Sequence, residues 1–197
     1  MNARPEGMGQ EMVERCAWAG TDPIYVAYHD EEWGVPLYDD LKLFEFLILE
    51  TFQAGLSWIT ILRKRENFRA AFDGFDYNKV AQYDATKFDS LILDKGIIRN
   101  KLKIKAAISN AKAFIEIKKE FGSFSNYIWA FVDGKPIKNK IENYKKAPPN
   151  TPLSDQISKD LKSRGFKFVG STVVYAHMQA TGMVNDHEIE CFRYDEV

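Results

Sequence analysis

One acidic residue, Glu50, lies in the largely apolar stretch from Leu47 to Trp58. Its carboxylate is a candidate functional group. At helical spacing Glu50 has Phe46, Leu47 and Ala54 as neighbours, so its charge projects from a face that is typical of a core. Burying a polar group without a partner costs roughly 2–7 kcal/mol, so the charge of Glu50 should have a partner. Two answers are open. One is a Lys or Arg from elsewhere in the chain, and the other is a cationic ligand held beside Trp58.

The two cysteines and two of the three histidines lie near the chain ends at a spacing that suits a metal ion. Twelve residues separate Cys16 from His29, and three separate His187 from Cys191. Together they predict a tetrahedral Cys2His2 zinc site, which would be structural because the protein fills all four positions. The alternative is two inert thiols with unrelated histidines. A disulfide between the cysteines is less favoured, because the cytoplasm is reducing. His177 is set aside because it falls in the middle of a predicted helix.

Residues 162–172 are typical of two helices joined by a short turn, with glycines that allow a tight reversal. The second helix is predicted to begin near Ser171. Its free N–H groups would then face outward from Gly170, beside Lys167 and Arg164, as a site for a DNA phosphate. The alternative is an ordinary connection between two helices.

The elements that must position these residues are predicted to be helical. The 197 residues, 45% of them hydrophobic, suffice for a sizeable core, and we expect residues 13–197 to form a single all-α domain after a flexible tail, residues 1–12. The pocket around Glu50 would lie mainly in 16–60 and the hairpin in 162–182. No secretory signal or long apolar run is evident, so we expect a soluble, cytoplasmic protein without membrane contact.

Periodicity and capping residues set the expected helix boundaries. A helix capped by Asp39 or Asp40 would run to near Gly55, and a second would start at Ser57. Further helices are predicted around 78–83, 86–93, 100–121 and 124–132, and from a cap at Ser154 to Ser163. Residues 136–152 are predicted to be a surface loop, and both chain ends are predicted to be non-helical.

The net charge of −1 gives no global attraction to nucleic acid, so any DNA binding must come from local patches. Three basic segments are candidates, at 63–65, 99–105 and 159–167. Each of them could equally be an ordinary solvated helix face.

Several motifs in one order resemble the bacterial DNA-3-methyladenine glycosylase I family, a zinc-containing branch of the helix-hairpin-helix glycosylases. The resemblance covers roughly Val13 to Cys191. The motifs that carry it are Glu14-Arg-Cys16-Ala-Trp18, Asp22-Pro-Ile-Tyr25, Ala27-Tyr28-His29-Asp30-Glu-Glu-Trp33-Gly34, Gln53-Ala-Gly-Leu-Ser-Trp58, Gly96-Ile-Ile-Arg99, Arg164-Gly-Phe-Lys-Phe-Val-Gly170 and Val184-Asn-Asp-His187.

The resemblance implies a monofunctional enzyme of base excision repair that flips 3-methyladenine out of alkylated double-stranded DNA and releases it as the free base. It implies structural zinc at Cys16, His29, His187 and Cys191. It also implies a base pocket made by Tyr28, Glu50 and Trp58, with Trp18 and Trp33 nearby. Glu50 would accept a hydrogen bond from the base and favour its positive charge, which makes it the catalytic candidate. Trp58 would stack on the base.

The hairpin would bind DNA through Lys167, Phe168, Gly170, Ser171 and Thr172. Thr172 occupies the position that holds a lysine in strand-cleaving relatives, so no lyase activity is expected. Asn185 falls in the slot of the aspartate that many helix-hairpin-helix glycosylases use, and Asp186 is expected to be structural.

Two further expectations concern the segment after Glu50. Leu56 would fill the gap that a flipped nucleotide leaves, or else it would be a core leucine. Thr51 and Phe52 depart from the family's usual small and polar residues, so the pocket floor could differ.

Two other functions compete with a glycosylase that acts as a monomer. A zinc-stapled DNA-binding module would use the same hairpin but would gain nothing from a buried Glu50. A small-molecule zinc hydrolase is disfavoured because four protein ligands close the metal.

Overall fold

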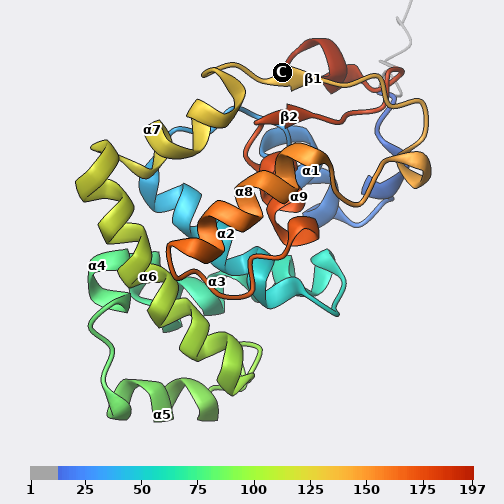
Figure 1. Ribbon diagram of the computed structural model, residues 1–197. Helices are drawn as coiled ribbons and strands as arrows, with labels where there is room; N and C mark the ends of the chain where they lie inside the picture. The colour runs from blue at the N-terminus through green and yellow to red at the C-terminus, as the bar shows by residue number, and fades with distance from the viewer. Residues whose placement is uncertain (1–12) are drawn as a thin grey trace, which may run out of the picture.

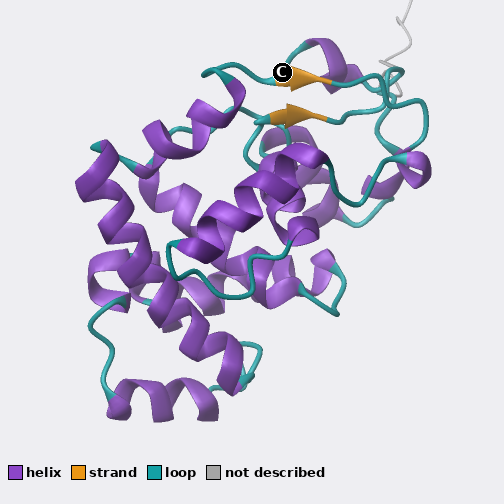
Figure 2. Ribbon diagram, viewed as in Figure 1, coloured by secondary structure: helices purple, strands orange, loops and turns teal. Residues whose placement is uncertain are grey.

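The computed structural model describes residues 13–197, and nearly all of its regular structure is helical (Figures 1 and 2). The predicted tail, residues 1–12, lies outside the described part. The α-helices are α1 (Pro23–Glu31), α2 (Asp40–Gln53), α3 (Trp58–Ala71), α4 (Tyr77–Val80), α5 (Ala85–Leu93), α6 (Lys101–Phe121), α7 (Phe124–Trp129), α8 (Pro152–Ser163) and α9 (Ser171–Ala180). Short 3-10 turns span Ala17–Ala19, Asp73–Phe75, Ala130–Val132, Tyr144–Lys146 and Phe192–Asp195. Among residues 13–197, no helix is both long and apolar enough to span a membrane. The predicted helical class is confirmed.

Helix α2 lies at the centre of the fold and packs against α3, α6, α7 and α9 (Figure 1). Every side chain from Leu43 to Phe52 is buried, as expected for a helix covered on all sides. Asp39 caps its first turn, because the Asp39 carboxylate accepts the N–H of Lys42 at 2.9 Å. The helix therefore presents Glu50 from a fixed position.

Helix α1 is absent from the sequence prediction, which left both chain ends non-helical. The start signal is nevertheless present, because the Asp22 side chain accepts the N–H of Ile24 at 3.0 Å and Pro23 occupies the first helical position. The helix is short and only weakly amphipathic, so its periodicity gave no signal. It carries Tyr28 and His29.

The predicted loop 136–152 contains a strand that the sequence did not reveal. Strand β1 (Ile137–Lys138) pairs in parallel with β2 (Val184–Asn185), and one further bridge joins Ile141 to Glu188 (Figure 2). Two residues are too few to show the alternation that predicts a strand. The pairing fastens this loop to the segment that carries His187.

The α8–α9 hairpin begins its second helix at Ser171, as predicted. Its first helix starts earlier than expected, because Thr151 rather than Ser154 is the cap, and the two form a reciprocal capping box. Asn110 on α6 fixes the turn between the helices: its amide oxygen accepts the Lys167 N–H at 2.7 Å and its amide nitrogen donates to the Lys167 carbonyl at 3.0 Å.

A buried ion-pair network joins α1, α2 and α3 behind the region where the site lies. Arg65 on α3 donates to Glu45 on α2 at 2.6 Å and to Glu32, which caps α1, at 2.7 Å. The guanidinium also lies 5.0 Å from the ring centre of Phe46. Because Arg63 is paired with Asp22, the segment 63–65 is not the free basic patch that the sequence suggested.

We expect Arg65→Met to lower the free energy of unfolding by about 3 kcal/mol, because it breaks the buried pair with Glu45, which keeps only the half-exposed Arg69 as its partner. Arg63→Met is the matched control, since its pair with Asp22 is solvent-exposed and contributes little to stability. Urea denaturation measures both variants. Equal losses of unfolding free energy in the two variants would show that the buried network stabilises the fold no more than the exposed pair does.

Candidate active site and metal centre

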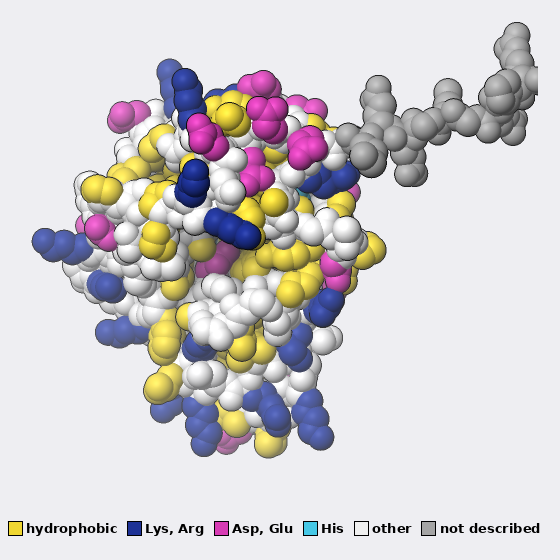
Figure 3. Space-filling model, turned by 90° about the vertical axis from the view of Figure 1, so that its right-hand side faces the viewer, with side chains coloured by type: hydrophobic (Ala, Val, Ile, Leu, Met, Phe, Trp, Pro, Cys, Tyr) yellow, Lys and Arg dark blue, Asp and Glu magenta, His cyan; other side chains and the backbone are white. Residues whose placement is uncertain are grey.

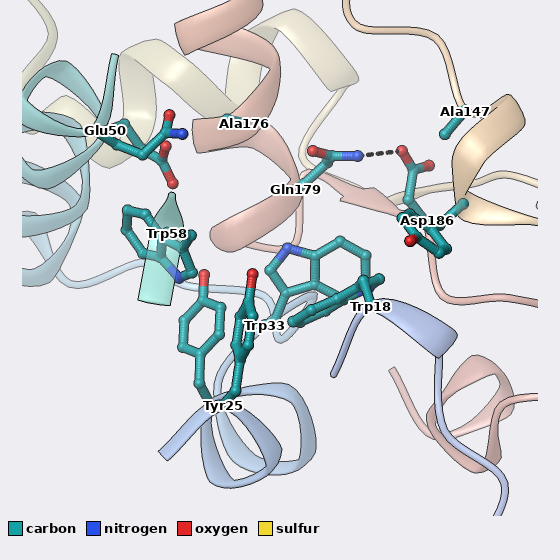
Figure 4. Close-up of a pocket in the computed structure, with 12 residues that line it drawn as sticks. Trp18, Tyr25, Trp33, Glu50, Trp58, Ala147, Ala176, Gln179 and Asp186 are labelled. Atoms are coloured by element: carbon teal, nitrogen blue, oxygen red, sulfur yellow. Dashed lines mark hydrogen bonds between the residues drawn. The ribbon is translucent and has the colours of Figure 1, made fainter. Parts of the chain in front are cut away.

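A cavity of about 240 Å³ opens among α1, α2, α3, α9 and the 3-10 turns at Ala17–Ala19 and Tyr144–Lys146 (Figure 4). On the face shown in Figure 3, hydrophobic side chains gather near the middle, Asp and Glu side chains gather above them, and Lys and Arg side chains lie mainly to the left and below. Pockets for drug-sized ligands span roughly 300–1,000 Å³, so this cavity suits a smaller molecule. It is lined by Trp18, Tyr25, Tyr28, Trp33, Glu50, Gln53, Trp58, Tyr144, Ala147, Ala176, Gln179 and Asp186.

Glu50 lies in the wall of this cavity and is only 4% exposed. Among residues 13–197, no side chain forms an ion pair or hydrogen bond with its carboxylate. Burial alone raises the pKa of Glu50 to about 8. The alternative of an internal Lys or Arg partner is therefore wrong for the described residues. At neutral pH the carboxyl is therefore largely protonated, and a cationic molecule in the cavity would favour its ionised form.

The aromatic walls face Glu50 and one another (Figure 4). The ring centres of Tyr28 and Trp58 lie 5.5 Å apart, and the Trp58 indole N–H is buried with no hydrogen-bond partner in residues 13–197. Trp18 meets Trp33 edge-on at 4.9 Å. The structure thus brings all five residues that the sequence assigned to a base pocket into one cavity. Flat aromatic walls suit a planar heterocycle.

Several lining residues were missed by the sequence analysis. Gln53 follows Glu50 by one helical turn, and its amide donates to the Leu56 carbonyl at 2.6 Å. Gln179 projects from α9, while Tyr25 and Tyr144 come from α1 and a 3-10 turn. Helical spacing from Glu50 could have identified Gln53. The others come from separate parts of the chain, so no local pattern links them.

Asp186 is both structural and part of the cavity wall. It is 3% exposed and accepts hydrogen bonds from Tyr175 at 2.6 Å, Asn139 at 2.7 Å and Gln179 at 2.8 Å. Asn185 instead donates to the carbonyls of Tyr194 and Val197 and does not line the cavity. The carboxylate that reaches the cavity from this segment is therefore that of Asp186.

Thr51 and Phe52 do not form the cavity floor. The Thr51 hydroxyl donates to the Ile48 carbonyl at 2.7 Å, and Phe52 packs edge-on against Phe68 in the core. Both are fully buried, and neither lines the cavity. The expectation that they alter the floor is not met.

The four predicted metal ligands form one buried cluster. The ligand atoms of Cys16, His29, His187 and Cys191 all lie within 4.8 Å of one another. Of these, Cys16 precedes α1, His29 is on it, and the other two follow β2, so the cluster joins the amino- and carboxyl-terminal segments. Two thiols and two imidazoles are a donor set that suits a tetrahedral metal ion.

Hydrogen bonds around the cluster turn one nitrogen of each imidazole toward the thiols, and the His29 Nε2 also lies 3.3 Å from the Cys16 backbone N–H. The Nδ1 of His29 pairs with Asp30 at 2.7 Å, so its Nε2 faces the Cys191 thiol at 3.4 Å. The Nε2 of His187 pairs with the Trp33 carbonyl at 3.0 Å, so its Nδ1 faces Cys16 at 3.4 Å. Such outer partners are what orient metal-binding histidines. The residues present therefore fit a metal ion.

The two cysteine thiols of the cluster interact with each other and with the histidines. The Cys16 thiol, followed by the two histidines, lowers the pKa of the Cys191 thiol well below its usual range. The hydrogen bond to Cys191 and burial raise the pKa of the Cys16 thiol. A metal cation bound between them would favour the thiolate form of both thiols. His177 lies apart and its Nε2–H donates to the Leu43 carbonyl on α2 at 3.1 Å, as the sequence predicted for a helix histidine.

The hairpin turn is exposed at its tip. Phe168 is 41% exposed and adopts a left-handed backbone with φ 56°, while Lys167 and Thr172 are also exposed. Gly170 caps α9 without a side chain, which leaves the first N–H groups of that helix open. Arg164 does not join them, because it is paired with Asp160 and Glu120.

Leu56 sits at a second exposed turn. It is 39% exposed beside Gly55, whose φ is 84°, so the alternative of a core leucine is wrong. Lys103 fixes this turn by donating to the carbonyls of Phe52 at 2.9 Å and Ala54 at 2.7 Å. Lys103 is thereby buried and not part of a free basic patch.

A family model described as methyladenine glycosylase matches residues 18–194, which is most of the chain. The chain belongs to the methyladenine glycosylase family. The resemblance drawn from the motifs is therefore confirmed.

Two kinds of relative support the assignment to the methyladenine glycosylases. DNA-3-methyladenine glycosylase 1 of Escherichia coli (strain K12) is 49% identical over 182 residues, which cover 92% of this chain and 97% of that protein. A crystal structure of 3-methyladenine DNA glycosylase I is 50% identical with a TM-score of 0.88, covering 91% of this chain and 98% of that one. A structure described as the basis of 3-methyladenine recognition by the Staphylococcus aureus enzyme is 39% identical with a TM-score of 0.87, covering 90% of this chain and 95% of that one. The helix-hairpin-helix glycosylase fold predicted from the sequence is confirmed.

Proposed function

We propose that this methyladenine glycosylase excises 3-methyladenine from alkylated duplex DNA and that its aromatic cavity holds the extruded base. The observation that carries the proposal is Glu50, a buried carboxylate with no partner in the described protein, set in a cavity with planar walls. A base methylated at N3 carries a positive charge in DNA, and normal adenine does not. The cavity therefore favours the damaged base over the undamaged one.

Two side chains account for this preference. Glu50 accepts a hydrogen bond from the exocyclic amine and attracts the cationic ring. Trp58 offers a face for stacking, and a desolvated cation over an aromatic ring gains roughly 0.5–2 kcal/mol. Because burial raises the pKa of Glu50 to about 8, the free protein holds much of it protonated at neutral pH. Arrival of the cationic base displaces that proton.

The bond that breaks joins C1′ of the sugar to N9 of the base, and its electron pair leaves with the base. Methylation has already made the base a good leaving group, so no acid needs to protonate it. Positive charge passes to the sugar, and water adds to C1′ with loss of a proton. The DNA phosphates and the acidic groups of the cavity stabilise that charge.

The metal in the Cys2His2 cluster is proposed to be zinc. Cys16, His29, His187 and Cys191 would hold it, and its contribution would be to fasten the chain ends rather than to activate water, since all four positions belong to the protein. We also propose that the protein acts as a monomer in the cytoplasm.

DNA would be gripped at the two exposed turns. Lys167, Phe168 and the first turn of α9, with Gly170, Ser171 and Thr172, would contact the phosphate backbone. Leu56 would enter the gap left by the flipped nucleotide. Its 39% exposure and its place beside the cavity residue Gln53 support this role.

The test is release of free base from methylated duplex DNA by purified protein. We expect 3-methyladenine to be released while the strand stays intact, because Thr172 cannot form the Schiff base that a lysine would form. Borohydride trapping checks the second point, and a trapped covalent complex would contradict it. No release by folded, metal-loaded protein would instead favour a DNA-binding module without catalytic activity.

A further inference from the structure

Glu188 connects the metal centre to two walls of the cavity. Its backbone N–H lies 3.2 Å from the Cys16 sulfur, so the residue touches a metal ligand through its main chain. Its side chain leaves in another direction and accepts two backbone N–H groups, from Ala17 at 2.8 Å and from Tyr144 at 2.8 Å. One carboxylate thus joins segments that are far apart in the sequence.

Each of the two N–H groups that Glu188 accepts belongs to the first residue of a 3-10 turn. One turn, Ala17–Ala19, carries Trp18, and the other, Tyr144–Lys146, begins with Tyr144. Trp18 and Tyr144 both line the cavity. A carboxylate is the favoured acceptor for the free N–H groups at the start of a helical turn. Glu188 therefore caps the two turns that supply these walls.

The loop that carries Tyr144 depends strongly on this contact. In the described chain, residues 142–150 make one hydrogen bond to the rest of the protein, from the Tyr144 N–H to Glu188. The other hydrogen bonds of these residues are local, such as those from Lys146 to Asn143 and from Ala147 to Tyr144. Without the Glu188 carboxylate, no other hydrogen bond in the described chain ties Tyr144 to the rest of the protein.

We propose that Glu188 is a positioning residue that sets Trp18 and Tyr144 around the bound base. The inference rests on the proposed function, because it concerns the cavity that holds 3-methyladenine. It gives the metal-binding end of the chain a second role beyond fastening the termini. Glu188 positions the two turns through its side chain, whereas it contacts Cys16 through its backbone N–H. Substitution of the side chain therefore removes the first contacts and keeps the second.

The test compares Glu188→Ala and Glu188→Gln with the wild type in three measurements. Titration with free 3-methyladenine, followed by tryptophan fluorescence, gives the affinity of the cavity. Metal analysis gives the ions held per chain, and amide hydrogen exchange reports the order of residues 142–150. Glu190→Ala is the matched control, because Glu190 is exposed two residues further on.

We expect Glu188→Ala to weaken 3-methyladenine binding by about tenfold and to speed exchange in residues 142–150, with the metal content unchanged. Glu188→Gln keeps one acceptor oxygen, so it should restore part of the affinity. Wild-type affinity in Glu188→Ala would overturn the inference, as would metal loss in parallel with the loss of affinity. Failure of the wild-type protein to bind 3-methyladenine would overturn the proposed function as well, whereas unchanged exchange would count against Glu188 alone.

Discussion

Glu50→Gln should lower kcat/KM for 3-methyladenine release by about 10- to 100-fold while leaving the fold and nonspecific DNA affinity intact. The amide keeps the size of the side chain but loses the charge that selects a cationic base. A hydrogen bond to a charged group is worth about 1.5–3 kcal/mol, and a tenfold change corresponds to about 1.4 kcal/mol. Wild-type kcat/KM should also rise with pH through about 8, as Glu50 ionises in the free protein, and the variant should lose that dependence.

The same substitution should make the free protein more stable in alkaline solution. Burial raises the pKa of Glu50 from 4.5 to about 8, so between these values the folded protein binds more protons than the unfolded chain. Stability is therefore lost as pH rises through this window. At about 1.4 kcal/mol per pKa unit, the advantage of Glu50→Gln should grow from nothing below pH 4.5 to as much as about 5 kcal/mol above pH 8.

Chemical denaturation of both proteins at several pH values measures this difference, and Glu31→Gln serves as the control because Glu31 is exposed on α1. Loss of activity without a gain in alkaline stability would mean that Glu50 has an unseen partner in the free protein. A gain in stability without loss of activity would remove Glu50 from base recognition. Only the two effects together fit a carboxylate that is kept buried and unpaired for a ligand.

The central helices could be predicted because their signals are local. Asp39 and Asn100 each precede a long apolar period, and each is observed as the cap of its helix. Glu50 was conspicuous for the same reason, since helical spacing alone placed its charge among apolar neighbours. What spacing could not decide was whether a basic residue from elsewhere reached it, because that depends on tertiary packing.

The segments that the sequence missed are those whose structure depends on distant partners. Strand β1 exists because the main chain of Ile137 pairs with Val184, and two residues leave no periodic trace. Arg63 and Arg65 look like a basic surface in sequence, yet each meets a carboxylate from another element. Asp186 reaches the cavity while Asn185 turns to the chain end, and a one-residue difference in direction is invisible without the fold.

Removing the metal should produce the largest loss of stability. The Cys2His2 cluster joins His29 to His187, and it closes a loop that contains most of the domain. Closing a loop of 100 residues or more is worth on the order of 5 kcal/mol in the chain-entropy description. For a domain of this size, that loss should lower Tm by roughly 10–20 °C. Calorimetry of the chelated protein measures it.

Cys191→Ser should reproduce the effect of chelation, since it removes one ligand, whereas His177→Gln should keep the metal because His177 lies outside the cluster. The affinity of the cavity for 3-methyladenine should fall together with the stability of the fold. Trp33 meets the His187 ring at 4.7 Å, and its carbonyl accepts a hydrogen bond from Nε2 of that histidine. Trp18 meets the His29 ring at 5.2 Å. Two of the walls that would surround the base therefore rest directly on the metal ligands. Chelated protein that kept both its Tm and its 3-methyladenine affinity would show that the four side chains hold the chain ends together without an ion.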